Sequence, residues 1–271
     1  MSSSRFHLII VGDEILSGKR QDKHLSKAIE LLAARGLSLE SAEYVGDDPQ
    51  RITAVLKRAF QLSGESGDIV FSTGGIGATP DDHTRQCAAA ALGRDMALHP
   101  QAADLIRERM QDTAKEQGLP YEPDRADNIH RLNMGVFPVG AEIIPNPYNK
   151  IAGFSVGQVH FFPGFPVMAW PMMEWVLDTH YKHLHRAVAL QEKSVIVMGA
   201  MEATLTPLME KIEAEHAGIK VFSLPSVDHP QYGRHIELGV KGRAEAMDAA
   251  YAQLLAGLKT FGVVLGPELT R

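Results

Sequence analysis

The sequence is poor in cysteine and in long apolar runs. It contains one cysteine, Cys87, which excludes a disulfide bond within the chain and fits a reducing compartment. No apolar run approaches the roughly 20 residues that a membrane-spanning helix needs, and the first residues lack the apolar core of a signal peptide. We therefore expect a cytoplasmic protein that has no membrane partner.

Positive charge is also scarce. The 27 Lys and Arg residues are outnumbered by 33 Asp and Glu, for a formal net charge of −6, so the composition gives no sign of a nucleic-acid partner. The 271 residues are 45% hydrophobic and 22% charged, as in ordinary globular proteins with a sizeable core. This length allows one large domain or two smaller ones.

One glycine-rich stretch, FSTGGIGATPDDHT from Phe71 to Thr84, lacks the usual nucleotide-binding motifs. It has neither the Gly-Lys-Ser/Thr end of a Walker A loop nor the G-x-G-x-x-G fingerprint. An apolar run before it predicts a buried strand, and apolar residues after it predict a helix. Because strand, glycine turn and helix can aim backbone N–H groups at an anion, we interpret the stretch as a phosphate-binding loop, with a plain glycine turn as the alternative. Its glycines are Gly74, Gly75 and Gly77.

Two aspartates, Asp81 and Asp82, follow these glycines. Like charges repel, so they cannot serve a bare phosphate; they indicate either a cation between carboxylate and phosphate or a base. The alternative is that they cap the next helix, where Asp is favoured. Hydroxyl groups that can donate to a phosphate come from Thr73, Thr79 and Thr84.

The chain before the glycine loop alternates strands and helices. Strands are predicted at 6–11 and 37–45, a loop at 12–18 leads to a helix from about Asp22, and Asp48-Pro49 predicts a helix start with Asp48 as N-cap. This β-α-β-α-β-α order is typical of a parallel sheet covered on both faces, in which ligands bind beyond the carboxyl ends of the strands. Three acidic pairs fall at those ends: Asp13-Glu14, Asp47-Asp48 and Asp81-Asp82.

The chain after the loop is less regular. A helix is predicted at 101–117 and an irregular lid or binding loop at 118–150, rich in Pro and Asn. A hairpin is expected at 157–158, then an apolar helix. Three cations of the irregular segment are candidates for phosphate contacts, with solvated surface charge as the alternative: Arg125, Arg131 and Lys150.

Residues 181–192 are predicted to be a linker, after which the pattern changes. Strand and helix patterns then follow in the order β-α-β-β-α-β, which is that of a ferredoxin-like unit. We therefore predict a three-layer α/β/α domain at 1–185, followed by a small α+β domain at 190–271.

Four motifs in this order resemble the MoaB/Mog fold, most closely the CinA-type N-terminal domain that is also fused to eukaryotic FAD synthases. They are VGDEILSG at 11–18, VGDD at 45–48, STGGIGATPDDHT at 72–84 and FPGFP at 162–166. The second unit resembles the middle domain of CinA proteins. The sequence stops before the CinA deamidase domain would begin, so deamidation of nicotinamide mononucleotide is not expected.

The resemblance implies a phosphorylated small-molecule partner, either a pterin such as molybdopterin or a dinucleotide, and a divalent cation such as Mg, Mn or Co. It also implies a homo-oligomer, with a dimer favoured because of the added domain. The expected activity is hydrolysis of a pyrophosphate bond in ADP-ribose or an FAD-like molecule. The alternatives are molybdopterin adenylylation and molybdopterin binding without catalysis.

Site residues carried over by position fall into three groups. The acids expected to act in catalysis are Asp47 and Asp82, with Asp81 as a close rival. The metal ligands are expected to be Asp13, Glu14 and Asp82. The ligand-binding residues are Gly12, Asp13, Glu14, Ser17, Gly18, Thr73, Gly74, Gly75, Gly77 and Thr84.

Two segments depart from the family pattern. Many CinA-type domains read D-T-N soon after the first loop, where this chain has Gln21-Asp22-Lys23-His24, and G-T-A-P-G-F where it has residues 148–154. Because both segments belong to loops on the substrate side, the departures indicate a different substrate or a loss of activity.

Overall fold

A computed structural model describes residues 4–185 and 191–270. The chain divides into two compact units, 1–185 and 186–271. Of the predicted linker, residues 186–190 lie outside the described part, and Lys182–Leu184 form the 3₁₀ helix η2. Within the described part, no helix is both long enough and apolar enough to cross a membrane.

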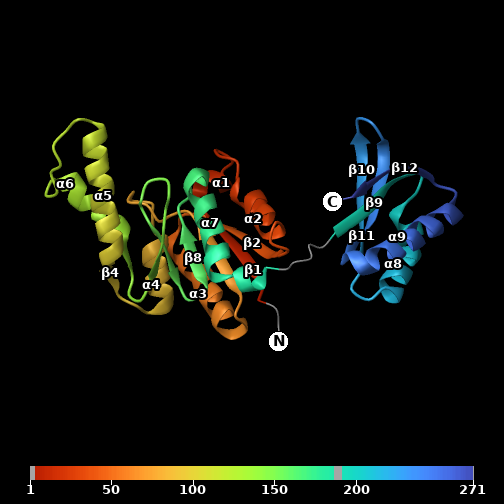
Figure 1. Cartoon of the computed structure of the whole chain (residues 1–271), viewed down its shortest axis with the longest axis horizontal. Coiled ribbons are helices and arrows are strands. Elements are labelled where there is room, and N and C mark those ends of the chain that lie inside the picture. The colour runs from red at the N-terminus through yellow and green to blue at the C-terminus, as the bar shows by residue number, and fades with distance from the viewer. Residues whose placement is uncertain (1–3, 186–190, 271) are drawn as a thin grey trace. The chain divides into compact units, whose positions relative to one another are not determined.

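The first unit is built on a six-stranded sheet (Figure 1). Its first four strands are parallel neighbours, and only β7 runs against the others. The mostly parallel sheet confirms the predicted fold class. In spatial order the strands are β2 (Leu39–Val45), β1 (Phe6–Val11), β3 (Ile69–Thr73), β8 (Val159–Phe162), β7 (Gly153–Val156) and β6 (Glu142–Ile144).

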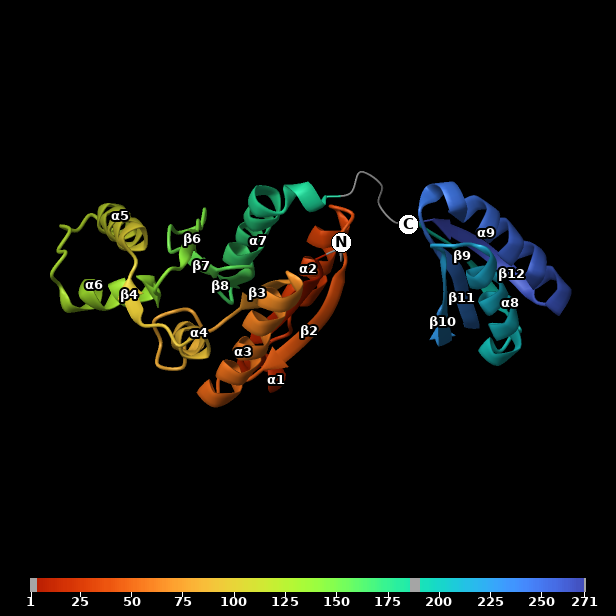
Figure 2. The same ribbon diagram turned by 90° about the horizontal axis from the view of Figure 1, so that it is seen from below.

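Helices cover both faces of this sheet, as Figures 1 and 2 show. On one face, α3 (Pro49–Ser66) and α4 (Thr84–Leu92) share a core with Ile9 and Phe161. On the other, α2 (His24–Ala33) and α7 (Pro166–His180) enclose a second core. Strands β1, β3 and β8 are almost wholly buried, as expected for a sheet packed on both sides.

The large apolar side chains of α7 pack in a core of the first unit. Met172, Met173, Val176 and Leu177 are fully buried, and Trp170 and Trp175 pack against the same core. This helix therefore gives no support to the predicted oligomer, which stays a prediction.

The segment between α4 and β6 was predicted to contain one helix and a long irregular loop. The helix is present as α5 (Pro100–Glu116), but the segment 118–150 is irregular only in part. The chain there forms further short elements, because Pro and Asn cap and separate short pieces of structure as readily as they mark loops. They are β4 (Met96–Leu98), α6 (Ala126–Arg131), the 3₁₀ helix η1 (Leu132–Gly135) and β5 (Val136–Pro138), with β4 paired to β5.

The second unit has the predicted β-α-β-β-α-β order. Its sheet is antiparallel, in the order β10-β11-β9-β12, and both helices cover one face. The core includes Val197, Leu205, Leu238 and Leu254. The elements are β9 (Gln191–Met198), α8 (Glu202–Glu215), β10 (Lys220–His229), β11 (Gly233–Gly242), α9 (Ala244–Leu258), the 3₁₀ helix η3 (Lys259–Phe261) and β12 (Val264–Thr270).

The strand order fixes where a ligand can bind. From β1 the chain crosses to β2 on one side, then returns past β1 to β3 on the other. The connections therefore diverge beyond the carboxyl ends of β1 and β3, which opens a crevice there. The glycine loop follows β3 directly, so it lies at this crevice.

The N-cap of α3 provides a test of the local fold. The Asp48 carboxylate accepts a hydrogen bond from the Arg51 backbone N–H at 2.8 Å, which confirms the predicted cap. We expect Asp48→Ala to lower the free energy of unfolding by about 1 kcal/mol, and Asp48→Asn to change it little because Asn also caps. Urea unfolding of both variants checks this, and equal losses would contradict the capping role.

Candidate functional site

A cavity of about 600 Å³ lies at the carboxyl ends of the four parallel strands. Its walls come from the segments that follow β1, β2, β3 and β8, and from the β6–β7 connection. This volume is within the range of small-molecule sites. The polar and glycine positions that line it include Gly12, Glu14, Arg20, His24, Asp47, Thr73, Gly74, Gly75, Gly77, Thr79, Asp81, Asp82, Asn146, Asn149 and Gly164.

The glycine loop follows a path that only glycine can take. Gly74 and Gly75 have φ of 97° and 67°, in the left-handed region. A Cβ on Gly74 would overlap the Val11 carbonyl oxygen, and one on Gly75 would overlap Thr84 Oγ1. The protein's own atoms therefore require glycine at both positions, before any ligand is considered.

This path leaves backbone donors without partners. Among the described residues, the N–H groups of Gly75, Ile76 and Gly77 donate to no acceptor, although this stretch lines the cavity. The buried Thr73 hydroxyl at the end of β3 also lacks a partner there. Consecutive N–H groups of this kind form a concave anion site, and buried polar groups are rarely left unpaired. The loop is therefore suited to a phosphate.

Thr84 supports the loop from behind. Its hydroxyl donates to the Gly74 carbonyl at 3.0 Å, and its N–H donates to the Gly75 carbonyl at 2.9 Å. The side chain is fully buried and does not line the cavity. The structure thus places Thr84 as a supporting residue, where the sequence suggested a ligand contact.

Arg85 is a second support, and the sequence analysis missed it. Its buried guanidinium donates to the carbonyls of Gly77 at 2.6 Å and Val136 at 3.2 Å, and also to that of Asn133. Burial lowers the pKa of Arg85. The sequence did contain a signal for this burial. Arg85 precedes Ala88 and Ala89 by three and four residues, which places all three on one face of α4.

The acidic loops after β1 and β2 are joined to each other. The Asp13 N–H donates to Asp47 Oδ2 at 2.9 Å, and the Asp47 N–H donates to Asp13 Oδ1 at 3.2 Å. Burial, together with repulsion from Asp13, Glu14 and Asp81, raises the pKa of Asp47, although the hydrogen bond from Asp13 opposes this. Asp47 therefore faces the cavity in a fixed position and an unfavourable charge environment.

The two aspartates of the glycine loop have different surroundings. Asp82 Oδ2 accepts from the Thr79 N–H at 2.8 Å and the Thr79 hydroxyl at 2.5 Å, which closes a turn. Asp81 is exposed at the cavity rim. The residue before α4 is His83, so neither aspartate caps that helix.

Part of the first acidic loop differs from expectation. Asp13–Leu16 form a short helix, α1, where a loop was predicted, because four residues are too few to show helical periodicity. Glu14 lines the cavity, but Asp13, Ser17 and Gly18 do not.

A divalent cation fits this site only if it shares its coordination with a ligand. No three His, Cys, Asp or Glu side chains within the described ranges are grouped closely enough to hold a metal ion. Magnesium, however, commonly binds to one or two carboxylates together with substrate phosphates and water. Glu14, Asp47, Asp81 and Asp82 supply carboxylates to the cavity, so they suit an ion bound with a phosphate.

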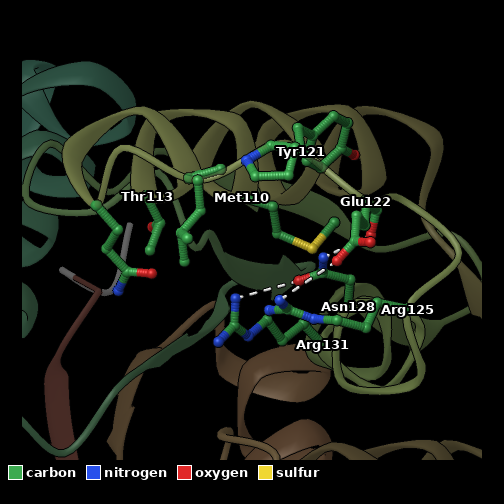
Figure 3. Close-up of a pocket in the computed structure, with 11 residues that line it drawn as sticks. Met110, Thr113, Tyr121, Glu122, Arg125, Asn128 and Arg131 are labelled. Atoms are coloured by element: carbon green, nitrogen blue, oxygen red, sulfur yellow. Dashed lines mark hydrogen bonds and ion pairs between the residues drawn. The ribbon is translucent and has the colours of Figure 1, made fainter.

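The three cations of the segment 118–150 are engaged elsewhere. Arg125 pairs with Asp127, and Lys150 pairs with Asp112 and Glu108. Arg131 bonds Asn128 beside a separate hollow between α5 and α6 (Figure 3). At about 30 Å³, that hollow has room only for water. The cation that does line the main cavity is Arg20.

The comparisons with known proteins agree with this geometry. The sequence profile of a family described as "Probable molybdopterin binding domain" matches residues 7–183. The chain belongs to this family. The match covers almost all of the first unit, and so all of the segments that line the cavity.

Individual relatives of this family extend the comparison. A CinA-like protein from Geotalea uraniireducens is 30% identical over 246 residues, which are 88% of this chain but 54% of the relative; the chain thus spans about half of that protein. A protein from Pyrobaculum calidifontis is 27% identical, with 94% and 95% covered. The crystal structure of a CinA protein of unknown function from Thermoplasma acidophilum aligns with a TM-score of 0.52 and 26% identity, covering 65% of this chain and 98% of that one.

Two glycines form a matched test of the loop. Gly75 and Gly93 have similar φ, 67° and 63°, but a Cβ on Gly93 meets nothing within 4 Å. We expect Gly93→Ala to destabilise by about 1–2 kcal/mol and Gly75→Ala by about 2–5 kcal/mol, because only the second adds a clash to the backbone strain. Urea denaturation measures both, and equal effects would contradict the role of Thr84.

Asp47 provides a pH test. Its raised pKa means that the folded state binds more protons between the ordinary pKa and the raised one, so stability falls as pH rises through that window. We expect Asp47→Asn, which cannot ionise, to melt at a higher temperature than the wild type near pH 7 in chelator. The gain should vanish near about pH 4. Asp48→Asn is the control, and a lower melting temperature for Asp47→Asn at pH 7 would contradict the repulsion.

Proposed function

We propose that the first unit binds a phosphorylated pterin or dinucleotide and hydrolyses a phosphoanhydride bond in it with the help of a divalent cation. The observation that carries the proposal is the run of unpaired N–H groups from Gly75 to Gly77 beside four cavity carboxylates. Backbone N–H donors alone would suit a protein that only carries an anion. N–H donors together with carboxylates suit an anion that binds with a metal ion.

The glycine loop has the binding role. The N–H groups of residues 75–77 and the Thr73 hydroxyl donate to phosphate oxygens, while Arg85 and Thr84 keep the loop in shape. These donors are fixed before the ligand arrives, so little reorganisation is needed on binding. Arg20 lies in the same cavity wall and offsets part of the acidic charge.

A divalent cation would be held by the carboxylates of the cavity, with Glu14 and Asp82 as its protein ligands. Asp82 keeps Oδ1 for this purpose, since the two bonds from Thr79 go to Oδ2. When bound, a divalent ion supplies neutralisation of the charge that develops on the phosphate and the leaving oxygen.

Asp47 has the role of general base. Its carboxylate is held by the Asp13 N–H and faces the cavity. Burial and neighbouring acids raise its pKa, which makes it a better proton acceptor than an ordinary carboxylate. A water molecule between Asp47 and the phosphate would lose its proton to Asp47 as its oxygen bonds to phosphorus, while the phosphoanhydride P–O bond breaks and its oxygen leaves with the second phosphate.

A panel of turnover assays tests this function. The purified chain is incubated with ADP-ribose, with FAD, and with molybdopterin plus ATP, each with Mg, Mn or Co and with a chelator control. We expect hydrolysis of a dinucleotide that stops in chelator. Adenylylated molybdopterin as the product would favour the transferase alternative. Ligand binding without any product would favour a non-catalytic molybdopterin-binding protein.

Two variants distinguish the catalytic role proposed for Asp47 from the capping role of Asp48. Asp47→Asn should lower turnover about 100-fold or more, as loss of a positioned general base does, while it remains folded. Asp48→Asn should leave turnover unchanged, because Asp48 caps α3. Steady-state kinetics of both proteins decide the matter. Full activity of Asp47→Asn would overturn the assignment of the base.

A further inference from the structure

The segment Asp22-Lys23-His24, where the chain departs from the family pattern, reaches the cavity through one residue. Asp22 is used by the fold: its carboxylate accepts from the N–H groups of His24 at 2.8 Å and Leu25 at 3.1 Å, and from the Tyr44 hydroxyl at 2.9 Å. Lys23 is exposed and does not line the cavity. His24, the first residue of α2, does.

The protonation of His24 follows from its surroundings. Nε2 lies 3.0 Å from the Gly164 carbonyl oxygen, which can only accept, so Nε2 carries the proton. The side chain is 5% exposed, and burial lowers its pKa. Burial therefore favours the neutral ring, in which Nδ1 presents a lone pair.

That lone pair has no partner. Nδ1 is buried and accepts no hydrogen bond within the part of the chain that the structure describes. A buried acceptor without a donor is unfavourable and is rare in folded proteins. His24 lines the ligand cavity, so the nearest source of the missing donor outside the protein is a molecule bound there.

The position of His24 restricts which part of a ligand it meets. Gly164, which it contacts, packs on the glycine loop: a Cβ on Gly164 would lie 3.5 Å from the Gly74 Cα. The next residue, Phe165, lines the cavity with an exposed side chain. His24 thus lies between the glycine loop and Phe165, where the organic part of a phosphorylated ligand would begin.

We propose that His24 Nδ1 accepts a hydrogen bond from a hydroxyl or N–H group of the ligand, so that His24 selects ligands by the group next to their phosphate. The assignment rests on the proposed function, because it requires the phosphate to occupy the glycine loop. The phosphate oxygens of a metal-bound diphosphate carry no proton to donate, and a neutral Nδ1 has none to offer them. His24 therefore accepts a hydrogen bond from a sugar hydroxyl or a ring N–H, and it adds nothing to the affinity for bare pyrophosphate.

Two substitutions separate this role from a structural one. His24→Gln places an amide near Nε2, so it keeps the bond to Gly164 but has no acceptor at Nδ1. His24→Asn places its amide oxygen near Nδ1 and loses the bond to Gly164. Thermal melting reports the structural bond, and ligand affinity reports the acceptor.

The probes are the non-hydrolysable α,β-methylene analogue of ADP-ribose, which keeps the hydroxyl and amino donors, and the magnesium complex of inorganic pyrophosphate in mildly alkaline solution, which has none. Both are titrated calorimetrically into the full chain with Mg present. We expect His24→Gln to bind the analogue about tenfold more weakly than the wild type, as loss of one hydrogen bond does, and to bind pyrophosphate equally well. His24→Asn should melt earlier but bind the analogue more tightly than His24→Gln.

Three results overturn the assignment. Wild-type affinity of His24→Gln for the analogue would show that Nδ1 meets no donor. An equal loss for analogue and pyrophosphate would place His24 on the phosphate. Affinities that follow the melting temperatures would make His24 purely structural. In each case wild-type binding of the analogue leaves the proposed function standing, whereas a wild-type protein that binds neither probe removes both.

Discussion

The packing of the glycine loop against its own neighbours is the constraint on which the site depends. The Val11 carbonyl and the Thr84 hydroxyl leave no space for a Cβ on Gly74 or Gly75, and Arg85 holds the Gly77 carbonyl. Thr84 also bonds the carbonyl oxygens of Gly74 and Gly75, which therefore point toward the protein. Because the peptide unit is planar and trans, the N–H groups that follow, those of Gly75 and Ile76, point away from Thr84 and have no acceptor. The proposed anion site is a consequence of how the backbone is held.

The acids around this loop make the free protein electrostatically unfavourable. Carboxylates after β1, β2 and β3 converge because parallel strands end at one edge, and Asp47 is held among them by two backbone bonds. Such an arrangement is destabilising by itself, and the proposed cation and phosphate would relieve it. Under the proposed function, stability and ligand recognition are therefore opposed at Asp47, as is common at sites of chemistry.

The sequence predicted the fold well and the site in part. Periodicity and the Asp48-Pro49 start were enough for the alternating elements, because those signals are local. The lining by Glu14, Asp47, Thr73 and the loop glycines followed from the carboxyl-end rule. The supporting role of Thr84 and the bonds of Arg85 did not, because they depend on which distant carbonyls the fold brings near. The short elements between α4 and β6 were missed because none is long enough to show a period.

Arg85 also links the site to the order in which the chain folds. Two of its three carbonyl partners, Asn133 and Val136, lie 48 and 51 residues further along the chain. Contacts over such separations form late, because the entropy of closing a long loop must first be overcome. The glycine loop is complete in sequence by Gly77, yet its Arg85 support is assembled only after the segment that carries η1 and β5 has docked. During synthesis, the glycine loop therefore gains its full Arg85 support only after the chain has been made through Val136.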